Sequence, residues 1–391
     1  MKKVELLAPA GNFKCLAAAI KAGADAVYFG LKEFSMRDNA QNFSLKELDK
    51  VRKVCRENKV RMYLTLNTIM FDSELKKVEE IIKKVKNKVD AIICWDLAVI
   101  NLCKKHKIKF HISTQASIAN AEAARFYKKL GAERAILARE LNLKQIKEIS
   151  KVMPVEIFIH GSMCVAVSGR CFTSQFLHGR SANRGKCRNT CRKAYTVRDD
   201  EGNELRVGNN KIFSAKDLCT LPFIEKLKQS GAVSFKIEGR GREPEYVYSV
   251  TKIYRGALDK KLSKKDIERL TEEMKEVYNR GFSEGFYFKS PTSDDFTTTE
   301  HGESKKTKRF LGKVFHYWDK AGVAGIKLNA GKLQIGDEVI ILGKETFLKE
   351  RIKSMEIEGK KVKSVNKGQD VGIKVEKCRK GDEVYLVVDK C

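Results

Sequence analysis

Four cysteines lie within one short stretch of this 391-residue chain. They are Cys164, Cys171, Cys187 and Cys191, in the segment "HGSMCVAVSGRCFTSQFLHGRSANRGKCRNTCRK" that covers residues 160–193. Four thiolates suit either a tetrahedral zinc ion or an iron-sulfur cluster, since both prefer soft sulfur ligands. Only Cys187 and Cys191 have the short separation typical of a structural zinc site. The spacing therefore favours a cluster, with zinc and an unligated set of thiols as the alternatives.

The same segment contains no Asp or Glu but many cations. Those around the cysteines are His178, Arg180, Arg184, Lys186, Arg188, Arg192 and Lys193. Such a group can bind phosphates or a carboxylated small molecule through charge-assisted hydrogen bonds. The alternative is that the cations only balance the charge of thiolate and sulfide.

Short apolar runs that are rich in β-branched residues recur eight times before residue 241. They lie at residues 4–10, 25–30, 60–67, 91–96, 109–117, 134–140, 155–162 and 234–240, with amphipathic segments between them. One such segment begins with Ser44 and has Glu47 three residues later, which predicts a capping box at the start of a helix. Alternating apolar strands and helices predict a parallel sheet covered by helices. Eight units predict closure as a (β/α)8 barrel, with a doubly wound open sheet as the alternative.

The cysteine-rich segment belongs to a long insertion, residues 163–233, between the seventh and eighth predicted strands. An insertion at this place emerges at the C-terminal mouth of the barrel, where barrel enzymes build their active sites. We expect the barrel to occupy residues 1–260, and a helical segment with a polar linker to occupy residues 261–309. Short alternating strands with glycine turns over residues 310–391 predict a small β-barrel accessory domain.

The chain is strongly basic, with 78 Lys and Arg against 50 Asp and Glu and a formal net charge of +28. This excess predicts a polyanionic partner, and RNA first, although a Lys- and Glu-rich thermophile surface would also contribute. No stretch approaches the roughly 18 apolar residues of a membrane span, and the first ten residues lack the apolar run of a signal peptide. We therefore expect a cytoplasmic protein without a membrane partner, whose scattered cysteines are buried apolar residues rather than disulfides.

Several stretches of the sequence together resemble the collagenase-like peptidase family U-32. They are "EIFIHGSMCVAVSGRCFTSQ" and "GRSANRGKCRNTCRKAY" around the cysteines, "SFKIEGR" at residues 234–240 and the opening "LLAPAGNFKCLAAAIKAGADAVYFG". The resemblance covers nearly the whole chain. Members of this family include prephenate-dependent tRNA uridine 5-hydroxylation proteins, a 23S rRNA hydroxylase and an oxygen-independent ubiquinone hydroxylation pair. These members resemble one another in a 4Fe-4S cluster that cysteines hold.

The resemblance implies that Cys164, Cys171, Cys187 and Cys191 hold a 4Fe-4S cluster, with Cys219 as the reserve ligand. It also implies a carboxylated co-substrate such as prephenate, for which guanidinium groups are suitable partners. The candidate substrate-binding residues are Arg37, Asn42, Arg139, Arg180, Arg184 and Arg240, and the candidate catalytic residues are Gln115, His160 and Glu238. A simpler role is open to two of the arginines, because Arg139 could pair with Glu140 and Arg240 with Glu238.

The resemblance implies an iron-sulfur enzyme that hydroxylates a pyrimidine in tRNA or ribosomal RNA independently of oxygen, with an electron-transfer partner. The accessory β-barrel, which the quinone-pathway members lack, and the positive charge favour the RNA-modifying branch. A peptidase that uses Cys164 or Ser162 with His160 is the alternative enzyme, although neither a Ser-His-Asp nor an HExxH pattern is present. The third hypothesis is a noncatalytic RNA-binding protein with a structural metal.

Overall fold

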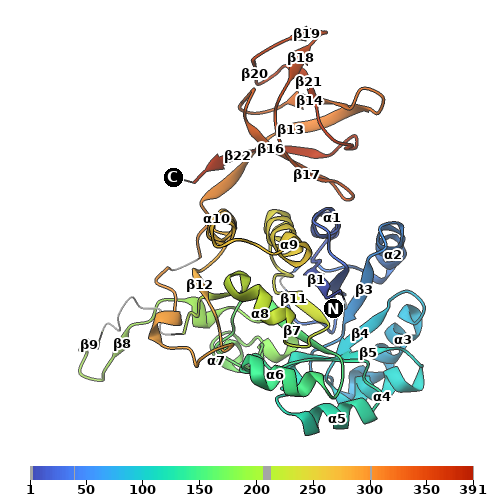
Figure 1. Cartoon of the computed structure of the whole chain (residues 1–391), viewed down its shortest axis with the longest axis vertical. Helices are drawn as coiled ribbons and strands as arrows, with labels where there is room; N and C mark the ends of the chain where they lie inside the picture. The colour runs from blue at the N-terminus through green and yellow to red at the C-terminus, as the bar shows by residue number, and fades with distance from the viewer. Residues whose placement is uncertain (1–2, 39, 206–212, 300–301, 391) are drawn as a thin grey trace.

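The structure, a computed structural model, describes residues 3–38, 40–205, 213–299 and 302–390. Within these ranges eight parallel strands form the first part of the molecule: β1 (Glu5–Pro9), β2 (Ala26–Gly30), β3 (Arg61–Thr65), β4 (Ala91–Cys94), β5 (Phe110–Ile112), β6 (Arg134–Ile136), β7 (Val155–Ser162) and β11 (Ser234–Ile237). Each strand pairs with the next along the chain, and β11 pairs in parallel with both β7 and β1. The sheet therefore closes, which confirms the predicted (β/α)8 barrel and excludes the open sheet (Figure 1).

Helices surround the barrel because each presents an apolar stripe to the strands, which are buried along most of their length. They are α1 (Phe13–Lys21), α2 (Leu48–Glu57), α3 (Leu75–Val85), α4 (Leu97–Lys105), α5 (Ala121–Lys129), α6 (Leu143–Ser150), α8 (Ile224–Lys228) and α9 (Pro244–Asp259). Before α2, the backbone N–H and hydroxyl of Ser44 donate to the Glu47 carboxylate at 2.9 and 2.8 Å. The predicted capping box is therefore present, at the short 3-10 turn that leads into α2.

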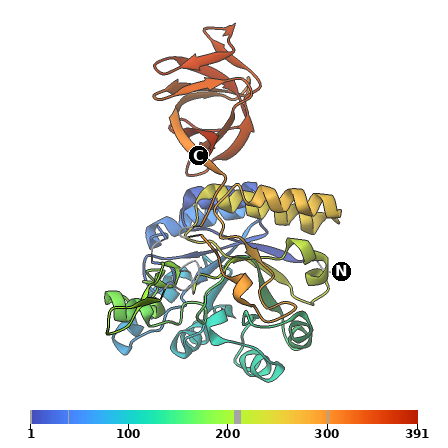
Figure 2. The same cartoon turned by 90° about the vertical axis from the view of Figure 1, so that its left-hand side faces the viewer.

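The insertion between β7 and β11 folds over the C-terminal ends of the barrel strands. It contains α7 (Thr173–His178), the hairpin of β8 (Val197–Arg198) and β9 (Glu204–Leu205), and β10 (Asp217–Cys219), which pairs antiparallel with the end of β7. The Asp38 N–H donates to the Gly185 carbonyl at 2.9 Å, and the Arg170 guanidinium donates to the Gln115 carbonyl at 3.1 Å. These contacts dock the cysteine-rich segment onto the loops that follow β2 and β5. In Figure 2 the insertion helix α7 lies on the side of the barrel opposite the N-terminus.

After the barrel come α10 (Lys264–Met274), β12 (Phe282–Ser283) and a second, antiparallel sheet. Its strands are β13 (Lys306–Trp318), β14 (Val323–Leu328), β16 (Glu338–Leu342), β17 (Phe347–Arg351), β18 (Met355–Ile357), β19 (Lys360–Lys361), β21 (Asp370–Lys374) and β22 (Glu383–Asp389), while β15 (Lys332–Gln334) and β20 (Ser364–Asn366) pair separately. These strands enclose an apolar core of their own, which includes Ile326 and Ile373. The all-β character predicted for this part is confirmed.

The second sheet packs on the barrel through α1 and α9. The rings of Tyr248 and Phe347 stack with their centroids 4.5 Å apart, and Lys14 Nζ lies 2.6 Å from the Glu383 carboxylate. No helix in the described ranges combines the length and the apolar character that crossing a bilayer requires.

Candidate active site

A cavity of about 80 Å³ opens at the C-terminal mouth of the barrel, under the cysteine-rich insertion. It is lined by side chains from the strands and from the loops that follow them: Tyr28, Met36, Arg37, Thr65, Asn67, Ile93, Ser113, Thr114, Gln115, Ile136, Arg139, Phe158, Cys164, Ser168, Lys236, Glu238 and Arg240. Five of the predicted substrate-binding and catalytic residues, Arg37, Gln115, Arg139, Glu238 and Arg240, thus come together beside Cys164. They meet because parallel strands deliver their carboxyl ends to one rim.

Two arginines in this cavity have nitrogen atoms without a protein partner. Arg139 donates through Nη1 to the Ser162 carbonyl at 2.7 Å, and Arg240 donates through Nη1 to the hydroxyls of Ser35, at 2.7 Å, and Thr65. The Nε and Nη2 atoms of both side chains are buried without a hydrogen-bond partner among the described residues. Neither arginine forms the ion pair that the sequence left open as its simpler role, Arg139 with Glu140 or Arg240 with Glu238. Burial lowers the pKa of both arginines, to about 10 for Arg240. Two buried, half-satisfied guanidinium groups are suited to receive an anion.

Arg240 packs directly against Gly30, where a side chain would collide with it. A Cβ atom on Gly30 would lie 2.4 Å from the Ser35 hydroxyl and 2.7 Å from Arg240 Nη1. It would also lie 2.9 Å from Oδ1 of Asn42. Asn42 was expected to bind substrate, but its amide instead donates to the carbonyls of Arg37 and Ala40, at 3.3 and 3.1 Å. Asn42 therefore shapes the loop that carries Arg37.

Glu238 is the carboxylate of this cavity. Burial alone would raise the pKa of Glu238, but Arg37, Arg242 and Arg139 hold it below its ordinary value. The nearest of these partners is Arg37, whose Nη2 lies 3.4 Å from the carboxylate. Burial alone would lower the pKa of Arg37. The Glu238 carboxylate opposes this effect, followed by the thiols of Cys164 and Cys187, and the pKa of Arg37 is raised as a result. Glu238 is therefore ionised and balances part of the cationic charge beside the cysteines.

The four predicted ligand cysteines lie within electrostatic range of one another. Burial raises the pKa of Cys191, Arg192 opposes that rise, and Cys164, Cys187 and Cys171 add to it. Backbone N–H groups point at two of the sulfur atoms, since Thr173 donates to Cys171 and Asn189 to Cys187, each at 3.4 Å. Such N–H donors stabilise thiolates and the clusters that thiolates hold.

A single metal ion would need the thiols to converge on one point. A single zinc ion needs Zn–S distances of about 2.3 Å, which places its sulfur ligands close to one point. No three His, Cys, Asp or Glu side chains of the described residues are arranged to hold one metal ion. Four thiols gathered in one insertion are nevertheless a donor set of the kind that iron-sulfur clusters use. Cys219, the reserve ligand, is 3 % exposed in the hydrophobic core beside Tyr254.

Besides Asn42, three of the predicted substrate-binding and catalytic residues do not line the cavity. The ring of His160 lies among Tyr246, Tyr254 and Phe282, on the helix side of the barrel. Burial lowers its pKa to about 3. The reason is a bulge: Lys236 pairs with Phe158 but Ile237 pairs with His160, so an extra residue in β7 reverses the alternation of its side chains.

The other two residues belong to the insertion. Arg184 is bound to the Glu74 carboxylate and stacks on Phe71, with its guanidinium carbon 4.4 Å from the ring centroid. Arg180 is exposed and has no side-chain partner in the described ranges. Arg184 thus anchors the insertion to the loop before α3, while Arg180 faces solvent.

The sequence reasoning missed Lys236, which lines the cavity from β11. Its ammonium donates to Glu156 at 2.9 Å and lies 4.3 Å from the centroid of the Tyr28 ring. Burial lowers the pKa of Lys236, and Glu156 opposes that shift. The available signal was a lysine inside an otherwise apolar strand, "SFKI", where a charge must have a buried partner.

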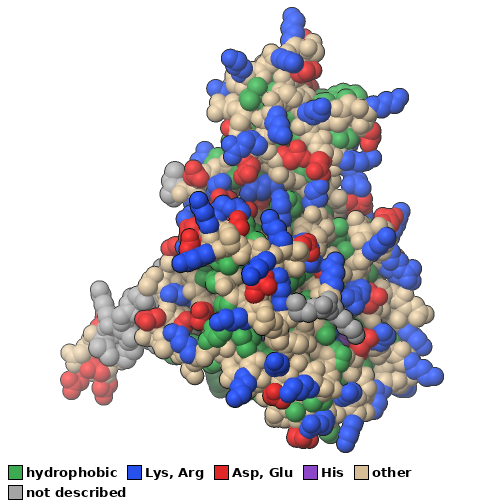
Figure 3. Space-filling model, viewed as in Figure 1, with side chains coloured by type: hydrophobic (Ala, Val, Ile, Leu, Met, Phe, Trp, Pro, Cys, Tyr) green, Lys and Arg blue, Asp and Glu red, His purple; other side chains and the backbone are tan. Residues whose placement is uncertain are grey.

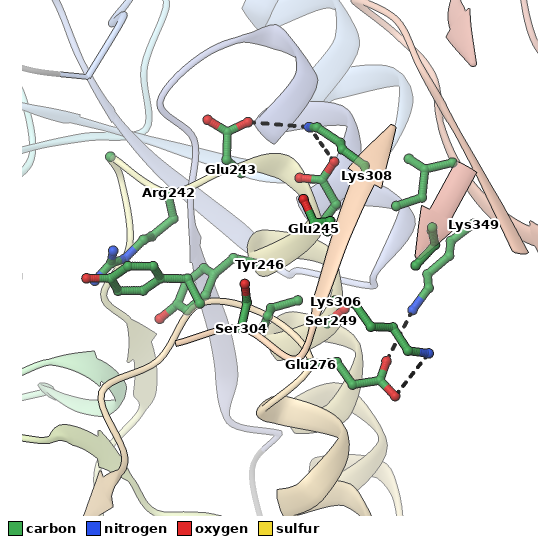
Figure 4. A pocket seen from close by; sticks show the side chains of 16 residues that line it. Arg242, Glu243, Glu245, Tyr246, Ser249, Glu276, Ser304, Lys306, Lys308 and Lys349 are labelled. Carbon is green, nitrogen blue, oxygen red and sulfur yellow. Dashed lines mark hydrogen bonds and ion pairs between the residues drawn. The ribbon is translucent and has the colours of Figure 1, made fainter. Parts of the chain in front are cut away.

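A larger cavity, of about 320 Å³, lies where the second sheet meets the barrel (Figure 4). Its cations are already paired: Lys308 with Glu243 and Glu245, and Lys306 and Lys349 with Glu276. Arg242 lines this cavity and stacks 3.7 Å from the centroid of the Tyr278 ring, while its Nη2 donates to Ser162 on β7 at 2.7 Å. This cavity therefore lacks the unpaired cations of the barrel mouth.

Comparison with known proteins finds close relatives. Residues 11–297 match the sequence profile of Peptidase family U32. A collagenase of Porphyromonas gingivalis is 38% identical over 390 residues, with 94% of each chain covered. The tRNA hydroxylation protein P1 of Bacillus subtilis is 33% identical, covering 88% of this chain and 84% of that protein. The 23S rRNA 5-hydroxycytidine C2501 synthase of Escherichia coli is 40% identical over 260 residues, which are 66% of this chain and 39% of the synthase.

Proposed function

Because this chain belongs to peptidase family U32, we propose that it is an iron-sulfur RNA-modification enzyme that hydroxylates a pyrimidine base independently of oxygen. Relatives named for tRNA hydroxylation and for synthesis of hydroxycytidine in ribosomal RNA support the reaction class. The net charge of +28 supports a polyanionic substrate. Lys and Arg side chains are spread over both the barrel and the second sheet on the face in Figure 3.

The observation that carries the proposal is the cavity at the barrel mouth. There the buried guanidinium groups of Arg139 and Arg240, each with unpartnered nitrogens, lie in one cavity with Cys164. A small carboxylated co-substrate, such as prephenate, would satisfy those nitrogens and would sit beside Cys164. The cavity has about 80 Å³ of free space, which suits part of a small acid rather than a nucleotide.

Replacing a pyrimidine C–H by C–OH breaks a C–H bond and forms a C–O bond. If water supplies the oxygen, two electrons and two protons must leave, and the two electrons pass to an acceptor. A 4Fe-4S cluster held by Cys164, Cys171, Cys187 and Cys191 supplies one-electron transfer when it is bound. The chain's own groups would bind the acid through Arg139 and Arg240, with Glu238 and Gln115 orienting it and Lys236, which also lines the cavity, as the candidate proton donor.

The test is a mass analysis of RNA nucleosides. The protein is produced in a bacterial host that lacks its own RNA hydroxylation proteins, and digested tRNA and ribosomal RNA are examined by mass spectrometry. We expect one pyrimidine to gain the mass of one oxygen with the wild type and none with Cys187→Ala. Cys378→Ala, at a buried cysteine of the second sheet, is the control that keeps the modification. An unmodified RNA pool from cluster-loaded wild-type protein would contradict the proposal.

The peptidase alternative needs His160 to activate Ser162 or Cys164. The His160 ring contacts aromatic rings instead, and the Ser162 hydroxyl accepts hydrogen bonds from Arg242 and Arg280 at 2.7 and 3.2 Å. A hydroxyl that accepts hydrogen bonds from two arginines is a poor nucleophile. A buried, neutral histidine that lies among aromatic rings is a poor general base. Cleavage of denatured collagen that is lost in His160→Gln but kept in Cys187→Ala would favour the peptidase.

A further inference from the structure

Helix α7 of the insertion presents an exposed apolar surface. Phe172, Phe176 and Leu177, called here the α7 face, are 64%, 86% and 58% exposed. The two phenylalanine rings lie with their centroids 6.4 Å apart. Single exposed apolar residues are common, but neighbouring exposed aromatic rings mark a binding surface.

Cations without carboxylate partners share the insertion with the α7 face. Arg180, Lys186, Arg188 and Lys193 are exposed, and their side chains contact no acidic group in the part of the chain that the structure describes. No Asp or Glu occurs anywhere in residues 160–193. Surface lysines and arginines elsewhere in the molecule form many ion pairs, for example Lys109 with Glu133 at 2.8 Å. The charge left around α7 is therefore available to a polyanion.

The α7 face and its cations are held together beside the cysteines. The Ser174 hydroxyl of α7 accepts the backbone N–H of Arg188 at 3.0 Å, and the Ser174 carbonyl accepts that of Arg180 at 3.3 Å. Phe172 directly follows Cys171 in the chain. The same insertion covers the barrel mouth, so a ligand on α7 would lie close to the candidate active site.

We propose that the α7 face, with Arg180, Lys186 and Arg188, is the docking surface for an unpaired loop of RNA. Unpaired bases expose faces that stack on aromatic rings, while the flanking phosphates pair with cations. A continuous duplex buries its base faces and would contact only the cations. Binding to a lipid surface scales with the apolar area that is buried, and α7 offers only six residues. The inference rests on the proposed function, because it names the form of RNA that the enzyme accepts.

The test measures binding without turnover. Cluster-loaded protein is titrated into a fluorescent RNA hairpin with an unpaired loop, and into a fully paired duplex of equal length, with anisotropy as the readout. We expect Phe176→Ala to weaken hairpin binding on the order of tenfold and to leave duplex binding unchanged. Phe176→Tyr should bind as the wild type does, because it keeps the ring. Phe126→Ala removes a 58% exposed ring from α5 and should have no effect.

Substitution of a cation should affect RNA binding differently from substitution of an aromatic ring. Arg188→Ala should weaken hairpin and duplex binding alike and should reduce the salt dependence of the affinity by about one phosphate contact. Three results would overturn the inference: hairpin affinity unaffected by Phe176→Ala, an equal loss for hairpin and duplex, or Phe176-dependent binding to vesicles of phosphatidylcholine and phosphatidylserine in place of RNA. Phe176-dependent hairpin binding without any modified nucleoside would keep this surface and reject the hydroxylase. A modified nucleoside together with unaltered hairpin binding in Phe176→Ala would keep the hydroxylase and reject this surface.

Discussion

The barrel contains two layers of buried charge that differ in how far the charges are paired. In the lower layer Glu156 is bound to Arg134 at 3.1 Å and to Lys236 at 2.9 Å, and Arg134 is also bound to Glu5 at 2.5 Å. In the upper layer, at the mouth, Arg139 and Arg240 keep two buried nitrogen atoms each without a partner. A paired network holds the fold together, whereas we propose that the unpaired cations bind a ligand. Stability and activity should therefore respond oppositely to mutations in the two layers.

The largest effect on stability is expected in the lower layer. Glu156→Gln removes the charge that Arg134 and Lys236 share and leaves two buried cations with too few anions. We expect the free energy of unfolding to fall by about 3–5 kcal/mol, measured by chemical denaturation. Glu148→Gln, at an exposed glutamate of α6, is the matched control and should be neutral. A loss as small in Glu156→Gln as in the control would refute the structural role of this layer.

The upper layer should give the opposite result. Arg139→Met removes a buried cation that lacks a full set of partners, so the free energy of unfolding should stay constant or rise by about 1 kcal/mol. Hydroxylation should fall by at least about a hundredfold, because the anionic co-substrate loses a donor. Denaturation curves and nucleoside mass analysis on the same preparation make this comparison. Lost stability together with intact hydroxylation would show that Arg139 belongs to the framework.

A pH titration examines His160, which lies in the same strand as Glu156 but outside both layers. Burial lowers its pKa from about 6.5 to about 3. Between these values the unfolded chain binds the proton and the folded chain does not, so stability falls as the pH falls, by about 1.4 kcal/mol per pH unit. His160→Gln should flatten this slope by that amount between pH 6 and 4. An unchanged slope would mean that His160 is protonated in the folded protein.

The smallest effect is expected for the exposed ion pairs between the barrel and the second sheet. Lys14 and Glu383 lie 2.6 Å apart but are 38% and 31% exposed. Because water screens such pairs, Lys14→Met should cost no more than about 1 kcal/mol, and that loss should shrink as salt is added. A loss of unfolding free energy comparable to that of Glu156→Gln would show that position in the barrel does not determine how much an ion pair contributes to stability.

Much of this arrangement was open to prediction from the sequence. Apolar runs gave the eight barrel strands, and the gap between the seventh and eighth strands placed the cysteines at the mouth. Arg37, Arg139, Glu238 and Arg240 could be foreseen as rim residues because they lie at the ends of predicted strands or in the loops after them. These inferences need only chain order and the polarity of parallel strands.

The rest depended on contacts that no local pattern encodes. The bulge that turns His160 outward arises from the pairing of β7 with β11, two strands separated by more than 70 residues. The ion pair of Arg184 with Glu74 joins residues even farther apart, 110 positions in the chain. A charge inside an apolar strand marks both Lys236 and Glu156 in the sequence, but only the closed barrel shows that they pair with each other. The choice between Arg139 as an ion-pair partner of Glu140 and as a cavity residue was likewise a matter of tertiary geometry.

The most direct test of the proposed iron-sulfur chemistry is metal and sulfide analysis of anaerobically purified protein, with electron paramagnetic resonance after dithionite reduction. We predict about four irons and four sulfides per chain, lost in Cys187→Ala and retained in Cys378→Ala. Stoichiometric zinc without labile sulfide, even after anaerobic reconstitution, would contradict it.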